Sequence, residues 1–161
     1  MSDFPSQDLQ KNLPKALALL HVGASSYICF VDPCMRNKHL SLRKRIHHWA
    51  GVNNCAKFGL TAVTLSTLAA AVNVWKMTKE PAWLLGGALL TCIIPYHLLF
   101  MQDETNVLEE DERKGKIELD LDKRGNLCDK LAAWTCKFHV KLALGVLAAG
   151  IFVWCEGKSN G

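Results

Sequence analysis

Histidines within long apolar segments are the side chains of this sequence best placed to carry out chemistry. His21, His97 and His139 lie in, or at the start of, stretches that are almost free of charged residues. A neutral imidazole there can act as a general base, and a pair of such histidines can hold a haem iron. Ionisable groups in apolar segments often mark functional sites. A local hydrogen bond between helices would also account for each of these histidines.

Polar neighbours of His21 fall at helical spacing, and a proline lies close to His97. Ser25 and Asp32 follow His21 on the same helical face. Pro95 precedes His97 by two residues, and its missing N–H predicts a kink near that histidine. We therefore expect these polar faces to line a pocket inside a helical bundle.

Four apolar stretches are the elements that must position the histidines. They contain 16, 18, 22 and 14 residues without Asp, Glu, Lys or Arg. A membrane span needs about 20 mostly apolar residues, and the shorter stretches reach that length if flanking lysines extend to the headgroups. No charged stripe with a period of 3.6 residues marks a water-facing side. The sequence predicts an all-α, four-helix transmembrane bundle with spans at about 14–32, 55–76, 82–101 and 134–155.

Charged residues are concentrated in the connections between these spans. Residues 36–57 contain six Lys and Arg and no acid, and residues 103–129 contain ten acids. This distribution favours one multi-pass membrane domain over residues 1–161, with a charged loop at 102–133. Membrane lipid is then the immediate partner.

The distribution of Lys and Arg predicts the orientation. Thirteen lie in the connections after the first and third spans, and five lie on the other side. The positive-inside rule places loops 33–57 and 102–133 in the cytosol, and we expect an endomembrane (ER) location. Five tryptophans near the ends of the spans are expected at the membrane interface. They are Trp49, Trp75, Trp83, Trp134 and Trp154.

Composition argues against several other classes of protein. The net charge of +4 comes without a basic stripe interleaved with aromatics, so we expect no nucleic-acid partner. The seven cysteines are odd in number and include no C-x-x-C, which argues against a disulfide framework and a zinc site. We expect no metal ligands and treat buried cysteines as small apolar side chains.

Three stretches resemble the anthrone oxygenase-like family of small four-helix membrane proteins. They are HVGASSYICFVDPCMR, IIPYHLLFMQDETNVLEE and LAAWTCKFHVKLALGVLAAGIF. The matching residues are Gly23, Ala24, Tyr27, Pro33, Arg36, Pro95, Met101, Thr105, Asn106, Leu108, Trp134 and His139. The sequence departs from the family at Asp32, where a histidine is common, and Lys141 is the nearest cation to the arginine usual after the last histidine.

This resemblance implies a cofactor-free oxygenase, an oxidoreductase that uses O₂ on a hydrophobic aromatic substrate. It implies that His139 is the base, that Trp134 stacks on the ring, and that Asn106 or Lys141 binds the substrate's oxygen atoms. The resemblance and the polar faces together give His139 and His97 as the candidate catalytic residues. The candidate substrate-binding residues are Trp134, Asn106, Lys141, Tyr27 and His21.

A non-enzymatic membrane scaffold or assembly partner is the alternative. Small residues such as Ala69, Ala70, Gly145 and Ala149 would then pack against helices of other proteins. An enclosed pocket that reaches His139 or His97 favours the enzyme, whereas histidines satisfied by their neighbours without a void favour the scaffold.

Overall fold

The structure, a computed structural model, describes residues 7–31, 40–114 and 121–159. These residues are almost entirely helical, and they include no strand. The prediction of an all-α fold is therefore confirmed. The elements are α1 (Gln7–Ser26), the π-helix η1 (Tyr27–Val31), α3 (Leu42–Thr78), α4 (Ala82–Thr91), α5 (Ile93–Phe100), α6 (Gln102–Lys114) and α7 (Leu121–Ser159).

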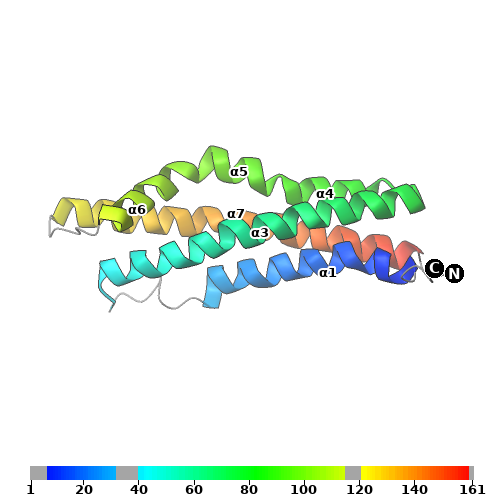
Figure 1. Cartoon of the computed structure of the whole chain (residues 1–161), viewed down its shortest axis with the longest axis horizontal. Coiled ribbons are helices and arrows are strands. Elements are labelled where there is room, and N and C mark those ends of the chain that lie inside the picture. Colours follow the sequence, from blue (N-terminus) through cyan, green and yellow to red (C-terminus); the bar gives the residue numbers. More distant parts are fainter. Residues whose placement is uncertain (1–6, 32–39, 115–120, 160–161) are drawn as a thin grey trace.

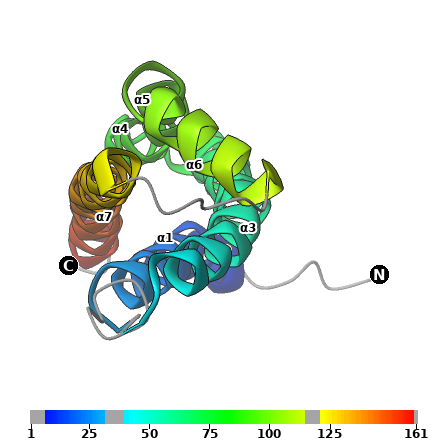
Figure 2. The ribbon, with the colours of Figure 1, turned by 90° about the vertical axis from the view of Figure 1, so that its left-hand side faces the viewer.

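Helices α1, α3, α4 and α7 lie side by side along one long axis (Figure 1). Both α1 and α4 pack against α3 and α7, so these four helices form a ring. Figure 2, a view along the bundle, shows α1 on one side of the ring and the chain of α4, α5 and α6 on the other. Side chains between these four helices therefore form the interior of the bundle.

Three helical segments of the described chain are long and apolar enough to cross a membrane. They are Leu42–Thr78, Ala82–Phe100 and Gly125–Lys158. The spans predicted at 55–76, 82–101 and 134–155 correspond to these segments. The described part of the span predicted at 14–32 is helical, as α1 and η1, but it is not among the three. Asp32, a member of the predicted polar face, lies outside the described residues.

Polar side chains lie inside the bundle, whereas large apolar side chains lie on its surface. His21 and Ser25 are fully buried, and Lys141 is only 7% exposed. Phe58 and Leu99, by contrast, are 75% and 76% exposed. Extensive apolar surface on helices without a polar stripe is typical of contact with membrane lipid.

Glycines allow α4 to approach its two neighbours closely. A Cβ atom on Gly86 would lie 2.6 Å from the Phe152 ring of α7. A Cβ atom on Gly87 would lie 3.1 Å from the Cβ of Ala71 in α3. Small residues at such crossings let helix backbones approach each other in a membrane. The position of α4 in the ring therefore depends on these two glycines.

The third predicted span is not one straight helix. Cys92 separates α4 from α5, and Met101 separates α5 from α6. Pro95 has no N–H to donate to the carbonyl of Thr91, so the helical hydrogen-bond pattern is interrupted there. The bend lies at Cys92, five residues before His97, and α5 arches away from α3 beyond it (Figure 1).

The tryptophans differ from the interfacial belt that the sequence predicts. Trp49, Trp83 and Trp134 are at most 2% exposed and belong to the core. Trp49 packs edge-on against Trp134 with ring centroids 5.7 Å apart, and Trp83 stacks on Phe152 at 5.6 Å. Burial of these large rings in helix contacts outweighs their preference for the headgroup region. Trp154 is exposed, as an interfacial residue would be.

Much of the charged segment 102–133 is helical. It contains α6 and the first turns of α7, and these two helices pack against each other. Glu104 is buried between them, 2.8 Å from Lys137 and 3.9 Å from Lys130. Lys137 also donates to the carbonyl of Phe100 at 2.6 Å. These contacts fix α6 to α7 at the end of the apolar segment.

Replacement of Gly86 by Ala is expected to destabilise the bundle by about 1–3 kcal/mol, because the added methyl group displaces the Phe152 ring. The thermal midpoint in detergent measures this loss. Gly150→Ala is the matched control, since it adds the same methyl group to α7 where no atom lies within 4 Å. Equal midpoints for the two variants would contradict the role assigned to Gly86.

Glu104 is expected to make the stability pH-dependent. Desolvation acts to raise the pKa of its carboxyl, but the hydrogen bond from Lys137 and the charges of Lys137 and Lys130 outweigh this and hold the pKa below its ordinary value of 4.5. The ion pairs therefore contribute fully above the unfolded-state pKa, and this contribution is lost as the pH falls through the lower folded-state pKa.

The measurement is the thermal midpoint in detergent between pH 7 and pH 3. The wild-type midpoint should fall more steeply below about pH 4.5 than that of Glu104→Gln, which cannot form the ion pairs at any pH. Parallel curves for the two proteins would show that these pairs do not contribute to stability.

Candidate functional site

A pocket of about 150 Å³ lies between α3, α5 and α7. It lies beside the bend at Cys92, where α5 diverges from α3 (Figure 1). Its lining is mainly apolar, and its polar side chains come from all three helices. They are Asn53, Lys57, Thr61 and Thr64 of α3, His97 of α5 and Lys141 of α7. We call this cavity the α3–α5–α7 pocket.

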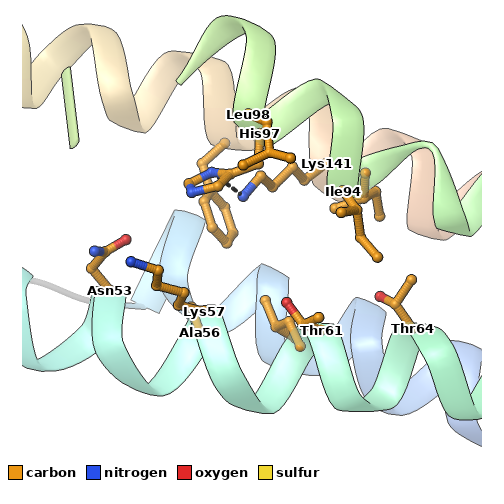
Figure 3. Close-up of a pocket in the computed structure, with 12 residues that line it drawn as sticks. Asn53, Ala56, Lys57, Thr61, Thr64, Ile94, His97, Leu98 and Lys141 are labelled. Atoms are coloured by element: carbon orange, nitrogen blue, oxygen red, sulfur yellow. Dashed lines mark hydrogen bonds between the residues drawn. The ribbon is translucent and has the colours of Figure 1, made fainter. Parts of the chain in front are cut away.

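A lysine–histidine pair forms one wall of the pocket. The Nζ atom of Lys141 lies 2.9 Å from Nδ1 of His97 (Figure 3). The same ammonium lies 5.0 Å from the centroid of the Phe138 ring. A protonated lysine only donates hydrogen bonds, so Nδ1 of His97 must accept, and the proton of the neutral imidazole is then on Nε2. The wall thus combines a cation with a proton acceptor.

The polar side chains of α3 face this pair from across the pocket (Figure 3). Asn53 donates to the carboxylate of Glu109 at 3.0 Å, and Lys57 lies 4.0 Å from the same oxygen atom. The hydroxyl of Thr64 is buried and has no hydrogen-bond partner among the described residues. The pocket therefore has two cations on facing walls and an unpaired hydroxyl deeper inside.

His21 of α1 adds a further polar side chain to this interior, beside the turn of α7 that follows Lys141. A Cβ atom on Gly145 would lie 3.0 Å from Cδ2 of His21, and Gly145 follows Lys141 by one helical turn. Neither ring nitrogen of His21 has a hydrogen-bond partner in the described part of the chain, and the same holds for the hydroxyl of Ser25. Unpaired buried polar atoms are rare in proteins and require an explanation.

The structure brings together three of the seven candidate site residues. His97 and Lys141 are in contact, and His21 lies one turn away from Lys141. Trp134 and His139, which the resemblance gives as the stacking residue and the base, do not line the pocket. The Nδ1 atom of His139 lies 2.8 Å from the carbonyl oxygen of Thr135.

The remaining candidates are separate from the pocket and from each other. Trp134 is fully buried between Trp49 and Phe138, where it stacks on Phe138 at 5.0 Å. Asn106 is exposed on α6, and Tyr27 is 55% exposed on η1. A substrate in the pocket would not contact these two side chains in this conformation.

The polar face of α3 is the part of the site that the sequence analysis missed. Asn53, Lys57, Thr61 and Thr64 follow one another at intervals of four, four and three residues. This spacing places them on one face of a helix, so the signal was present. The sequence analysis places Lys57 in a basic loop, whereas α3 already begins at Leu42, so the helical face continues beyond the predicted span.

The described residues contain no group of three or more His, Cys, Asp or Glu side chains that could hold a metal ion. The pocket itself contributes one histidine and two lysines.

Comparison with known proteins adds no assignment, because no family model, no curated protein and no solved structure matches this chain.

Lys141 is expected to be a functional residue whose burial does not stabilise the fold. Its ammonium has a neutral partner in His97, and burial of a charge without an opposite charge is costly. Lys141→Met keeps an unbranched side chain that is one atom shorter, and it should leave the thermal midpoint in detergent unchanged or raise it.

Lys137→Met is the comparison variant on the same helix. It removes the nearer of the two lysines that pair with buried Glu104 and should lower the midpoint by the equivalent of about 1–3 kcal/mol, because Lys130 remains 3.9 Å away. A loss of similar size for Lys141→Met would assign Lys141 a structural role.

Proposed function

We propose that the protein is a multi-pass membrane protein of four spans, in which α1 and η1 form the first. The helix from Lys15 to Val31 is about 24 Å long at 1.5 Å per residue. Lys15 forms an ion pair with Glu156 of α7, and Lys158 lies 3.5 Å from Glu80. These pairs neutralise charges at one end of the ring, which suits helices that leave the hydrocarbon layer there.

The proposed orientation places segments 33–57 and 102–133 in the cytosol and both termini in the lumen of the endoplasmic reticulum. The count of Lys and Arg supports it, with thirteen on the cytosolic side against five. The ion pairs of Lys15 and Lys158 then lie on the lumenal side.

Glycosylation tests this topology. An Asn-x-Thr acceptor added before Met1 through a short Gly-Ser linker should be glycosylated in microsomes, because glycosyl transfer takes place in the lumen. The same acceptor inserted within residues 115–120 should remain unmodified. Modification of the second site, or of neither, would contradict the orientation.

For the site itself, we propose that the α3–α5–α7 pocket binds a hydrophobic aromatic molecule with an acidic hydrogen and an oxygen that becomes negatively charged. The contact between Lys141 and His97 carries this proposal. An oxyanion can replace His97 as the partner of Lys141, which frees Nδ1 to accept a proton. The apolar lining strengthens both interactions, because it excludes water.

The reaction that best suits this pair is a cofactor-free oxygenation of the anthrone oxygenase type. His97 removes a proton from a CH₂ group beside an aromatic ketone, and Lys141 stabilises the oxygen that takes up the negative charge. The carbanion then supplies electrons to O₂. The CH₂ group and O₂ become a carbonyl group and water, so the substrate itself is oxidised and O₂ is reduced.

The size of the pocket limits what it holds in this conformation. Cavities of about 150 Å³ bind molecules the size of benzene. A substrate with several fused rings requires outward movement of side chains at the rim, such as Lys57 and Leu98, both of which are exposed. We therefore propose that a single ring occupies the pocket first, with larger substrates entering as the rim opens.

The scaffold alternative is favoured less by the contacts within the bundle. Gly145 faces His21, and Ala70 and Ala149 are buried within the chain. These small residues are therefore occupied by internal packing, while a pocket reaches His97. Ala69 remains exposed.

Binding of 4-nitrophenol tests the pocket directly, because it is a single ring with an acidic oxygen and its phenolate is yellow. The detergent-solubilised protein should bind it as the phenolate, and Lys141→Met should weaken that binding at least tenfold. Lys76→Met, at an exposed position near the end of α3, should bind like the wild type.

Turnover is tested with a hydroxylated anthrone in an oxygen electrode. His97→Gln should abolish oxygen uptake above the uncatalysed rate, whereas His139→Gln should retain most of it, since His139 lies outside the pocket. Uptake that survives in His97→Gln and is lost in His139→Gln would transfer the role of base to His139.

A further inference from the structure

A second cavity, of about 710 Å³, runs between α1, η1 and α3 on the outside of the bundle. Small side chains form its floor, because Gly51, Cys55 and Gly59 recur along one face of α3 at four-residue intervals. Leu20 and Val63 add apolar walls. We call this cavity the α1–α3 groove.

The two ends of the groove differ in chemistry. Because α1 and α3 run in opposite directions, Tyr27 lies at the same end as His47 and His48. Lys44 is exposed and precedes His48 by one turn on the same face of α3. The other end is lined by aliphatic side chains such as Leu20 and Val63. The groove is therefore polar and basic at one end and apolar along its length.

The charges around the polar end are predominantly positive. The first turn of α3 contains Arg43, Lys44 and Arg45, and none of the described residues that line the groove is acidic. From α6, Glu112 contacts Nδ1 of His47 at 2.7 Å. This contact engages one of the two histidines of the groove, while Lys44 remains exposed beside it.

The groove extends from the headgroup region into one leaflet of a bilayer. From Gly51 to Val63, α3 rises by about 18 Å at 1.5 Å per residue. Gly51 and Cys55 belong to segment 33–57 on the cytosolic side, and the headgroup layer is about 5–8 Å thick on each side of a hydrocarbon core of about 30 Å. The groove is therefore long enough to hold a lipid headgroup at its polar end and the first part of an acyl chain between Gly59 and Val63.

We propose that the α1–α3 groove is a binding site for one anionic phospholipid of the cytosolic leaflet. The glycerol backbone lies beside Gly51 and Cys55, an acyl chain follows Gly59 and Val63 into the span, and the phosphate accepts hydrogen bonds at the basic end from Lys44. Charge-assisted hydrogen bonds of this type hold lipid phosphates at basic sites. The proposal depends on the membrane orientation given above and is independent of the reaction proposed for the pocket.

A second copy of this chain fits the groove less well. Two copies in a membrane share one orientation, so a symmetric helix pair would bring their basic ends together. Residues 36–57 contain six Lys and Arg and no acid, and like charges at that contact would repel each other. An anionic lipid instead neutralises this end.

Native mass spectrometry of the full chain in detergent tests the proposal. The probes are dioleoyl phosphatidylglycerol and dioleoyl phosphatidylcholine, which share acyl chains and differ in headgroup charge. Phosphatidylglycerol should bind as a single retained lipid, at least about fivefold more tightly than phosphatidylcholine. Equal binding of the two lipids would overturn the charge-based assignment.

Glycine variants locate the bound lipid. Gly59→Leu fills the groove without a clash, since no atom lies within 4 Å of its Cβ position, and it should abolish retention of phosphatidylglycerol. Gly150→Leu is the matched control on α7, where the surroundings are equally open, and it should retain the lipid. Undiminished retention in Gly59→Leu would overturn the proposal.

Charge variants test the basic end. Lys44→Gln should weaken phosphatidylglycerol binding about fivefold, whereas Lys76→Gln, near the opposite end of α3, should have no effect. The same spectra report the oligomeric state. A dimer that Gly59→Leu converts to a monomer would identify the groove as a helix–helix interface and contradict lipid binding. Binding of 4-nitrophenol to Gly59→Leu reports separately on the pocket.

Discussion

The arrangement of this protein depends on one constraint, the apolar outer surface of its helices. Side chains such as Phe58 and Leu99 are largely exposed and need hydrocarbon around them. Polar groups between the helices are then separated from bulk water by both protein and lipid, so leaving them unpaired is costly. Among the described residues, Lys141 has the neutral His97 as its hydrogen-bond partner, whereas Glu104, in α6 beyond the apolar segment, pairs with two lysines. We therefore expect the Glu104 contacts, and not the Lys141 contact, to stabilise the fold.

The same constraint explains where a cavity forms. Gly86 and Gly87 hold α4 close to α7 and α3, and that half of the ring is tightly packed. Beyond Cys92 the missing N–H of Pro95 interrupts the helix, and α5 arches away. α4 is therefore packed closely against its neighbours, whereas the next helix, α5, is separated from α3. The pocket lies where α4 ends and α5 begins.

The pocket and the groove adjoin in α3. Ala56 and Leu60 line both cavities, so these two side chains lie between the pocket and the groove. One helix thus presents a polar face to the inside and a small-residue face to the outside.

The sequence by itself determined the helical architecture and the positions of three helices long and apolar enough to cross a membrane, because a long stretch without charged residues favours an apolar helix. It also indicated His97 and Lys141 as candidates. Only the tertiary structure placed these two in contact and left His139 outside the pocket, because the rotation of each helix depends on side-chain packing with its neighbours. Packing likewise decided that Trp49, Trp83 and Trp134 are core residues, since a tryptophan near the end of a span suits either the interior or the interface.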